Sequence, residues 1–114
     1  MIEKVLLDYL NENLDDPVYM AFPDNAPERL YVLEKTGSTF TDHVASATFA
    51  LQSYGGTLYE TATMNMVGIS AMLEAIELDT VTEVKLNSDY NFADTTRKRN
   101  RYQAVFNITH YEME

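Results

Sequence analysis

GGTLYETATMNMVGISAMLEAI, residues Gly55 to Ile76, largely determines which fold the chain can adopt. Thr57 and Glu60 have the spacing of a capping box, in which each side chain bonds a free backbone N–H at the start of a helix. Apolar residues then keep one face for about five helical turns, which predicts a long helix with a buried stripe. The residues predicted to form that stripe are Leu58, Ala62, Met66, Ile69, Leu73 and Ile76.

Gly68 lies in the middle of this predicted helix, where glycine gives up roughly 1 kcal/mol relative to alanine. A close contact between the helix and a sheet would explain a residue without a side chain at this point. Strands that could form such a sheet are predicted on both sides of the helix.

The residues before the helix have strand patterns. Residues 29–36, RLYVLEKT, are rich in β-branched and aromatic residues, and Gly37-Ser38 then predicts a loop. From His43 to Tyr54, apolar and polar residues alternate as in a half-buried strand. Two such strands in succession predict a β-hairpin. The residues predicted to share one face of the second strand are Ala45, Ala47, Phe49 and Leu51.

The residues after the helix predict a second hairpin. Residues 81–92 have strand composition, residues 93–100 form a polar loop, and residues 101–111 alternate again. One side of that last strand is predicted to carry Tyr102, Ala104, Phe106, Ile108 and His110.

The N-terminal residues predict a shorter amphipathic helix. Its apolar residues recur at helical spacing, and Asp15-Asp16-Pro17 ends it near Asn13, because the residue before proline favours extended backbone. Residues 17–22 are extended and either pair as a strand or only lie extended, and residues 23–28 form a turn. The apolar residues of this helix are Ile2, Val5, Leu6, Tyr9 and Leu10.

These elements predict an α+β fold in a single domain, residues 1–114. Strands and helices are segregated along the chain in the order α-β-β-(β)-α-β-β. We therefore expect an antiparallel sheet of four or five strands with both helices packed on one face.

Charge and cysteine content limit the function classes. The chain has no cysteine, which excludes disulfides, thiolate zinc sites and cysteine nucleophiles. Its formal net charge is −10, which repels nucleic acid and anionic membranes. Acids at Glu3 and Asp8 and the lack of a long apolar run do not fit a signal peptide or a membrane span, so we expect a cytosolic protein.

Few residues are candidates for catalysis or metal binding. The sequence has no phosphate-binding glycine loop, HExxH, GxSxG or calcium-loop spacing. His43 and His110 lie at the ends of predicted strands and could in principle hold a metal or act in acid–base catalysis. The sequence places no third ligand or orienting carboxylate beside either histidine. The alternative is one exposed histidine and one on a sheet face.

Two other groups also have a functional and a structural interpretation. Acidic residues lie at the C-terminal ends of both predicted helices. They could form a carboxylate pair for metal-assisted hydrolysis, a subunit contact or a solvated surface. They are Asp15, Asp16, Glu74, Glu77 and Asp79. Three methionines could line a pliable partner groove or fill the core, and we expect Met66 on the buried stripe. They are Met64, Met66 and Met72.

Four of the chain's eight basic side chains fall within residues 97–101, namely Arg97, Lys98, Arg99 and Arg101. Without them the rest of the chain has 18 acids against 4 bases, a net charge of −14. The cluster could bind nucleic-acid phosphates with Tyr102 stacking on a base, or it could be a soluble hairpin tip. It could also meet an acidic surface on another copy of the chain.

Three segments carry a resemblance to a known family: residues 17–38, PVYMAFPDNAPERLYVLEKTGS; residues 47–60, ATFALQSYGGTLYE; and residues 86–111, LNSDYNFADTTRKRNRYQAVFNITHY. Together they resemble the small acidic proteins of the head-to-tail joining region in siphophages and prophages of Gram-positive bacteria. Within that group the chain is most similar to the tail-terminator, or tail-completion, family of minor tail proteins.

The resemblance implies a structural protein with no enzyme activity, no cofactor and no metal. Members form a ring, usually hexameric, that caps the finished tail tube and presents a surface to the head connector. The implied partners are other copies of the chain, the tail-tube protein and the head connector protein. The implied location is the virion tail or neck, and the host cytoplasm during assembly, without a membrane partner.

A ring of this kind is consistent with the charge of the chain. DNA would pass through it without specific binding, because an acidic lumen repels phosphates. The basic residues Arg97, Lys98, Arg99 and Arg101 are then expected at the subunit interface. The alternatives are another neck component, such as a head-closure, stopper or connector protein, a small metal-dependent hydrolase using His43 or His110, and a nucleic-acid-binding domain.

Overall fold

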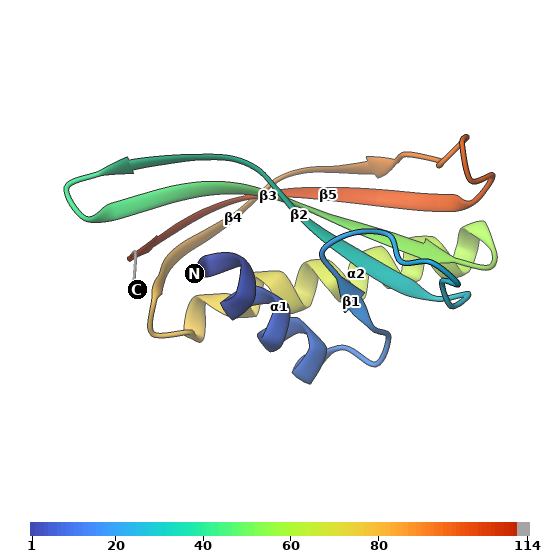
Figure 1. Cartoon of the computed structure of the whole chain (residues 1–114), viewed down its shortest axis with the longest axis horizontal. Helices are drawn as coiled ribbons and strands as arrows, with labels where there is room; N and C mark the ends of the chain where they lie inside the picture. Colours follow the sequence, from blue (N-terminus) through green and yellow to red (C-terminus); the bar gives the residue numbers. More distant parts are fainter. Residues whose placement is uncertain (112–114) are drawn as a thin grey trace.

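The computed structural model describes residues 1–111, which fold into two layers, a sheet and a pair of helices on one of its faces (Figure 1). The sheet has five strands in the order β1-β2-β3-β5-β4. The fold class and element order therefore agree with those predicted. The elements are α1 (Ile2–Asn13), β1 (Val18–Tyr19), β2 (Leu30–Thr41), β3 (Val44–Gly55), α2 (Leu58–Glu74), the short 3-10 helix η1 (Ala75–Glu77), β4 (Val81–Asn91) and β5 (Asn100–Tyr111).

The sheet is mixed, because β1 pairs with β2 in parallel while the other pairs are antiparallel. The prediction of an antiparallel sheet was wrong for this one strand. Its cause lies in α1, where the Asn11 amide accepts a hydrogen bond from the Val18 N–H at 2.9 Å and donates one to the Val18 carbonyl at 3.1 Å. The side chain of Asn11 thus holds the chain extended directly after the helix, beside β2.

The first hairpin is longer than predicted. Gly37-Ser38 does not open a loop; β2 continues through it to Thr41, with a β-bulge between Lys35 and Gly37. The turn lies at Asp42 and His43, which have φ of 52° and 69°. Positive φ at both positions defines a two-residue type I′ turn, which matches the twist of antiparallel strands. The hairpin consequently extends past the helices at one end of the molecule (Figure 1).

Helix α2 begins as predicted but buries a different face. Thr57 accepts a hydrogen bond from the Glu60 N–H at 3.1 Å, and the Glu60 carboxylate accepts one from the Gly56 N–H at 2.7 Å. The predicted stripe is largely exposed, with Met66 at 71% and Leu73 at 40%. The residues that α2 buries are Thr61, Met64, Asn65, Gly68, Ala71 and Met72.

The buried face of α2 is the one that can approach the sheet closely. A Cβ on Gly68 would lie 2.8 Å from Leu51 Cδ2 and 3.1 Å from Tyr31 Cε1, so only glycine fits without displacement. The Tyr31 hydroxyl donates to the Met64 carbonyl at 2.8 Å, and the Tyr9 hydroxyl of α1 donates to the Ala71 carbonyl at 2.8 Å. The expected close helix–sheet contact at Gly68 is confirmed.

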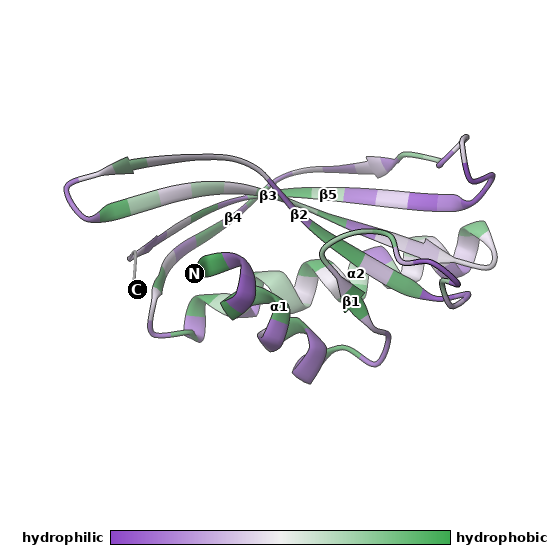
Figure 2. Ribbon diagram, viewed as in Figure 1, coloured by the Kyte–Doolittle hydropathy of each residue, from purple (hydrophilic) through white to green (hydrophobic). Residues whose placement is uncertain are grey.

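The apolar core lies mainly between the helices and the sheet, and the alternation along the strands is visible in Figure 2. The residues predicted to share one face of β3 and all but Tyr102 of those on β5 are buried. A smaller cluster on the other face of the sheet contains Leu30, Val32 and Tyr54. It is covered by the segment between β1 and β2, through Tyr19, Phe22 and Ala26.

We expect Gly68→Ala to lower the free energy of unfolding by about 1 kcal/mol, because overpacking against Leu51 and Tyr31 exceeds the gain in helix propensity. Gly37→Ala is the matched control, since a Cβ there meets nothing within 4 Å, and it should leave stability unchanged or raise it. Urea unfolding of the two variants measures the difference. A Gly68→Ala protein more stable than the wild type would contradict the close contact.

Candidate interaction surfaces

The β4–β5 turn, residues 92–101 and here called the basic loop, is organised around one buried carboxylate. Asp94 is 4% exposed and accepts hydrogen bonds at 3.0 Å from the Arg97 N–H, the Arg97 guanidinium and the Tyr54 hydroxyl. Asp94 and Arg99 also form an isolated β-bridge, and Lys98 has a positive φ of 56°. The loop is therefore a closed turn with its acid inside.

Three arginines of the basic loop bind to the protein itself. Arg99 donates to the carbonyls of Pro27 and Glu28, and Arg101 donates to the Phe92 carbonyl at 2.6 Å. The guanidiniums of Arg97 and Arg101 lie 4.2 Å from the ring centroids of Phe22 and Phe92. Cation–π contacts of this kind contribute roughly 0.5–1 kcal/mol each at exposed sites. The arginines thus join the loop to the segment that covers the smaller core cluster.

The protonation of Asp94 reflects these contacts. Burial by itself raises the pKa of Asp94, but hydrogen bonds from the Arg97 backbone, the Arg97 guanidinium and Tyr54 outweigh it, so the pKa lies below its ordinary value. The pKa of the Tyr54 hydroxyl is raised, chiefly by burial. Asp94 is consequently a carboxylate at neutral pH and balances one of the arginines around it.

The structure thus gives an internal role to Arg97, Arg99 and Arg101. Within residues 1–111, Lys98 is the member of the cluster whose side chain has no hydrogen bond or ion pair. Tyr102 follows Arg101 in a strand and so points to the opposite face of the sheet, away from the loop's aromatic contacts. An intermolecular role for the four basic residues stays a prediction.

The two histidines lie near the same end of the sheet but in different environments. His43 is exposed in the β2–β3 turn, with its ring edge-to-face against Phe40. His110 is 2% exposed on β5, with Nδ1 at 3.2 Å from the Tyr111 carbonyl oxygen. Within residues 1–111, no group of three or more histidines and acids is arranged to hold a metal ion. One exposed and one buried histidine match the structural interpretation.

The acids that follow the helices do not form one cluster. Asp16 accepts two hydrogen bonds from Arg29, at 2.9 and 3.1 Å, and Arg29 also contacts Glu60 at 2.9 Å. These carboxylates raise the pKa of Arg29 and tie the end of α1 to the start of α2. The other acids of that prediction are exposed, namely Asp15, Glu74, Glu77 and Asp79.

The methionines divide between the core and the surface. Met64 and Met72 are 1% and 0% exposed and fill the core, as the structural interpretation expected. Met66 is on the opposite side of α2, so its predicted place in the core was wrong. Its exposure follows from the rotation of α2 that Gly68 imposes.

Two exposed apolar surfaces were not predicted. One is the outer stripe of α2, which comprises Leu58, Ala62, Met66, Ile69 and Leu73, with Ile76 of η1. The other is the distal hairpin, residues 36–46, where Phe40 is 58% exposed. A sequence signal for the outer stripe exists: between residues 43 and 73, Glu60 is the only charged side chain in an otherwise charge-rich chain.

A comparison with models of known protein families found no match, and neither did a comparison with curated proteins. Neither α1 nor α2, the α-helices within residues 1–111, is long and apolar enough to cross a membrane. The fold, its surfaces and the sequence pattern are therefore the basis for a proposed function.

We expect Asp94→Asn to lower the free energy of unfolding at pH 7 by about 2 kcal/mol, because it removes a buried, charge-assisted hydrogen-bond acceptor. The pKa of Asp94 is lowered by folding, so its stabilising contribution is present above the ordinary value of 3.8 and is lost as pH falls through the lower folded-state value. The difference in free energy of unfolding between the wild type and Asp94→Asn should therefore shrink over that pH range. Urea unfolding across a pH series measures it.

Asp79→Asn is the control for this experiment, because Asp79 is exposed on the turn before β4. It should change stability by less than about 0.5 kcal/mol, as surface substitutions usually do. A deficit of Asp94→Asn that stays constant down to the acid limit would show that the charge of Asp94 is not what holds the basic loop.

Proposed function

We propose that the chain is a structural subunit of a phage neck, a tail terminator that caps the tail tube as a homo-oligomeric ring and joins it to the head. The observation that carries this proposal is a sheet left open at both flanks. Within residues 1–111, β4 pairs with β5 on one side only, and β2 pairs with β1 only through Tyr31 and Val32. Unpaired strand edges of this kind are sites where further protein chains add or pack.

The charge distribution supports a conduit for DNA. The formal net charge is −10, and the basic loop directs three of its four basic side chains to partners within the chain. A ring of such subunits would present little positive charge to phosphates, so DNA would slide through without specific binding. The proposal requires no catalytic group, cofactor or metal, and its other partners are the tail-tube protein and the head connector protein.

A second neck role uses the same surfaces. A head-closure, stopper or connector component would also be a small acidic ring-forming protein, but it would act on the head side of the junction. The two roles differ in what happens to the tail when the protein is missing, and that difference can be measured.

Loss of the chain from the phage or prophage that encodes it should give tails of irregular, excessive length, because nothing would stop growth of the tube. Electron microscopy of lysates measures tail length, and expression of the wild-type chain in trans should restore it. Tails of normal length that fail to join heads would instead assign the chain to head closure. Normal, infectious virions would reject both roles.

The interface role of the basic loop is tested with Lys98→Glu, because Arg97 and Arg99 also hold the loop together and their reversal would alter the fold. At low salt we expect Lys98→Glu to weaken self-association several-fold, and at high salt to match the wild type, since screening removes the attraction in both. Light scattering over a concentration series measures the mass. Lys4→Glu on α1, with the same change in charge, should assemble normally; equal behaviour of both variants would place Lys98 outside the interface.

A further inference from the structure

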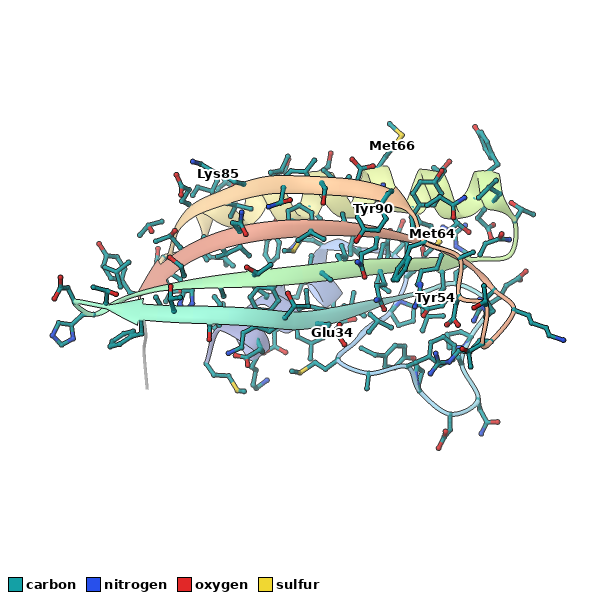
Figure 3. All side chains as sticks on the ribbon, turned by 90° about the horizontal axis from the view of Figure 1, so that it is seen from above. Glu34, Tyr54, Met64, Met66, Lys85 and Tyr90 are labelled. Atoms are coloured by element: carbon teal, nitrogen blue, oxygen red, sulfur yellow. The ribbon has the colours of Figure 1, made fainter. Side chains whose placement is uncertain are left out.

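The outer stripe of α2 is an apolar helix face without a sheet against it. Leu58 is 49% exposed, Met66 71% and Ile76 44%. Figure 3 shows Met66 projecting away from the sheet at the side of β4. Residues 61–73 contain no charged side chain. A helix face of this kind is normally buried against another layer of the protein.

The distal hairpin is the complementary case, a sheet face without a helix beneath it. The helices cover the middle of the sheet, and the hairpin continues beyond them (Figure 1). Phe40 pairs with Ala45 across the hairpin, on the face that the helices cover elsewhere. Beneath them lies a hollow of about 510 Å³, whose lining includes Ile2, Phe40, Ala45 and His110. Lys35 also lines it and is neutralised by Glu3 at 3.0 Å.

These two surfaces are the two halves of one kind of contact. Within residues 1–111, α2 packs on the sheet through one face, while Leu58, Met66 and Leu73 of its outer stripe and Phe40 of the distal hairpin remain exposed. Packing an apolar helix face on an apolar sheet face is the interaction that builds the core of this fold. The same interaction can therefore form between molecules.

The complementary shapes of the two surfaces and their lack of acids favour a second copy of this chain as the partner. Two molecules of net charge −10 repel each other, so an apolar contact between them is favoured where acids are absent. The outer stripe has no charged residue, and Asp42 at the turn is the only acid of the distal hairpin. Nucleic acid and anionic membranes offer no attraction to an uncharged surface on an acidic protein.

We propose that the outer stripe of one copy packs beneath the distal hairpin of the next copy, with Phe40 inserted beside Met66 and Leu73. The contact joins different surfaces of the two molecules, so a pair keeps one free stripe and one free hairpin, and repetition closes a ring when the rotation between neighbours returns to the first copy. This inference rests on the proposed function for its ring, but the contact itself is tested without any phage component.

The experiment uses two variants that each disable one half of the contact, Met66→Glu and Phe40→Glu. Both side chains are exposed, so both variants should fold, which thermal unfolding verifies. By light scattering after size exclusion, the wild type should form a multimer, and each variant alone should be monomeric at all salt concentrations. An equimolar mixture should give one-to-one dimers and nothing larger, because only the Met66→Glu hairpin and the Phe40→Glu stripe remain intact.

Val67→Glu is the matched control, since Val67 is 51% exposed on α2 but lies outside the outer stripe. It should assemble like the wild type. Assembly of either single variant, or no dimer in the mixture, would overturn the proposed pairing. If Met66→Glu fails to assemble while Phe40→Glu assembles like the wild type, two outer stripes face each other instead.

A wild-type chain that stays monomeric on the order of 1 mM, where an association worth about −4 kcal/mol is half-populated, would also overturn the inference. The outcome is separate from that of the tail-length experiment. One-to-one dimers together with tails of normal length in the absence of the chain would retain the contact and reject the terminator role.

Discussion

The close contact between Gly68 of α2 and Tyr31 of β2 sets the arrangement of the two layers. The Tyr31 ring fills the space that a side chain at position 68 would need, and its hydroxyl donates to the Met64 carbonyl one turn earlier. Burial raises the pKa of this hydroxyl, so it remains protonated and a donor at neutral pH. The contact fixes the rotation of α2 about its axis. Leu58, Met66 and Leu73, on the opposite side of the helix, are exposed as a consequence.

The basic side chains of the basic loop serve mainly to stabilise one end of the sheet. Four basic residues in one turn would repel each other if all faced solvent, and the buried Asp94 carboxylate relieves this repulsion from inside. The arginine guanidiniums pack over the aromatic rings of Phe22, Tyr54 and Phe92. The positive charge of the cluster is thereby used to hold together one end of the sheet, and Lys98 is the part that extends toward solvent.

The fold class and nearly all elements could be predicted from the sequence, because capping residues, turn residues and alternation act locally. The rotation of α2 could not. Its sequence has two faces without charge, and the stronger apolar stripe is the exposed one, since the buried face uses small residues such as Gly68 and Ala71 for close approach. The loop predicted at Gly37 was wrong because the Thr and Phe residues after it favour a strand more than one glycine disfavours it. The Phe22 ring that Arg97 contacts and the carbonyl that Arg99 binds lie on a distant segment, which no local pattern indicates.

The exposed stripe and the acidic remainder of the surface have opposite effects on association. Apolar area favours contact without regard to partner, whereas a net charge of −10 opposes contact with any acidic protein, including another copy. The chain buries a core of its own without contribution from a neighbour. Association through an uncharged stripe and hairpin is then a separate step, whose strength depends on concentration and on how well the two surfaces are aligned. A binding site that already orders several copies would supply both, and under the proposed function the tail tube would be that site.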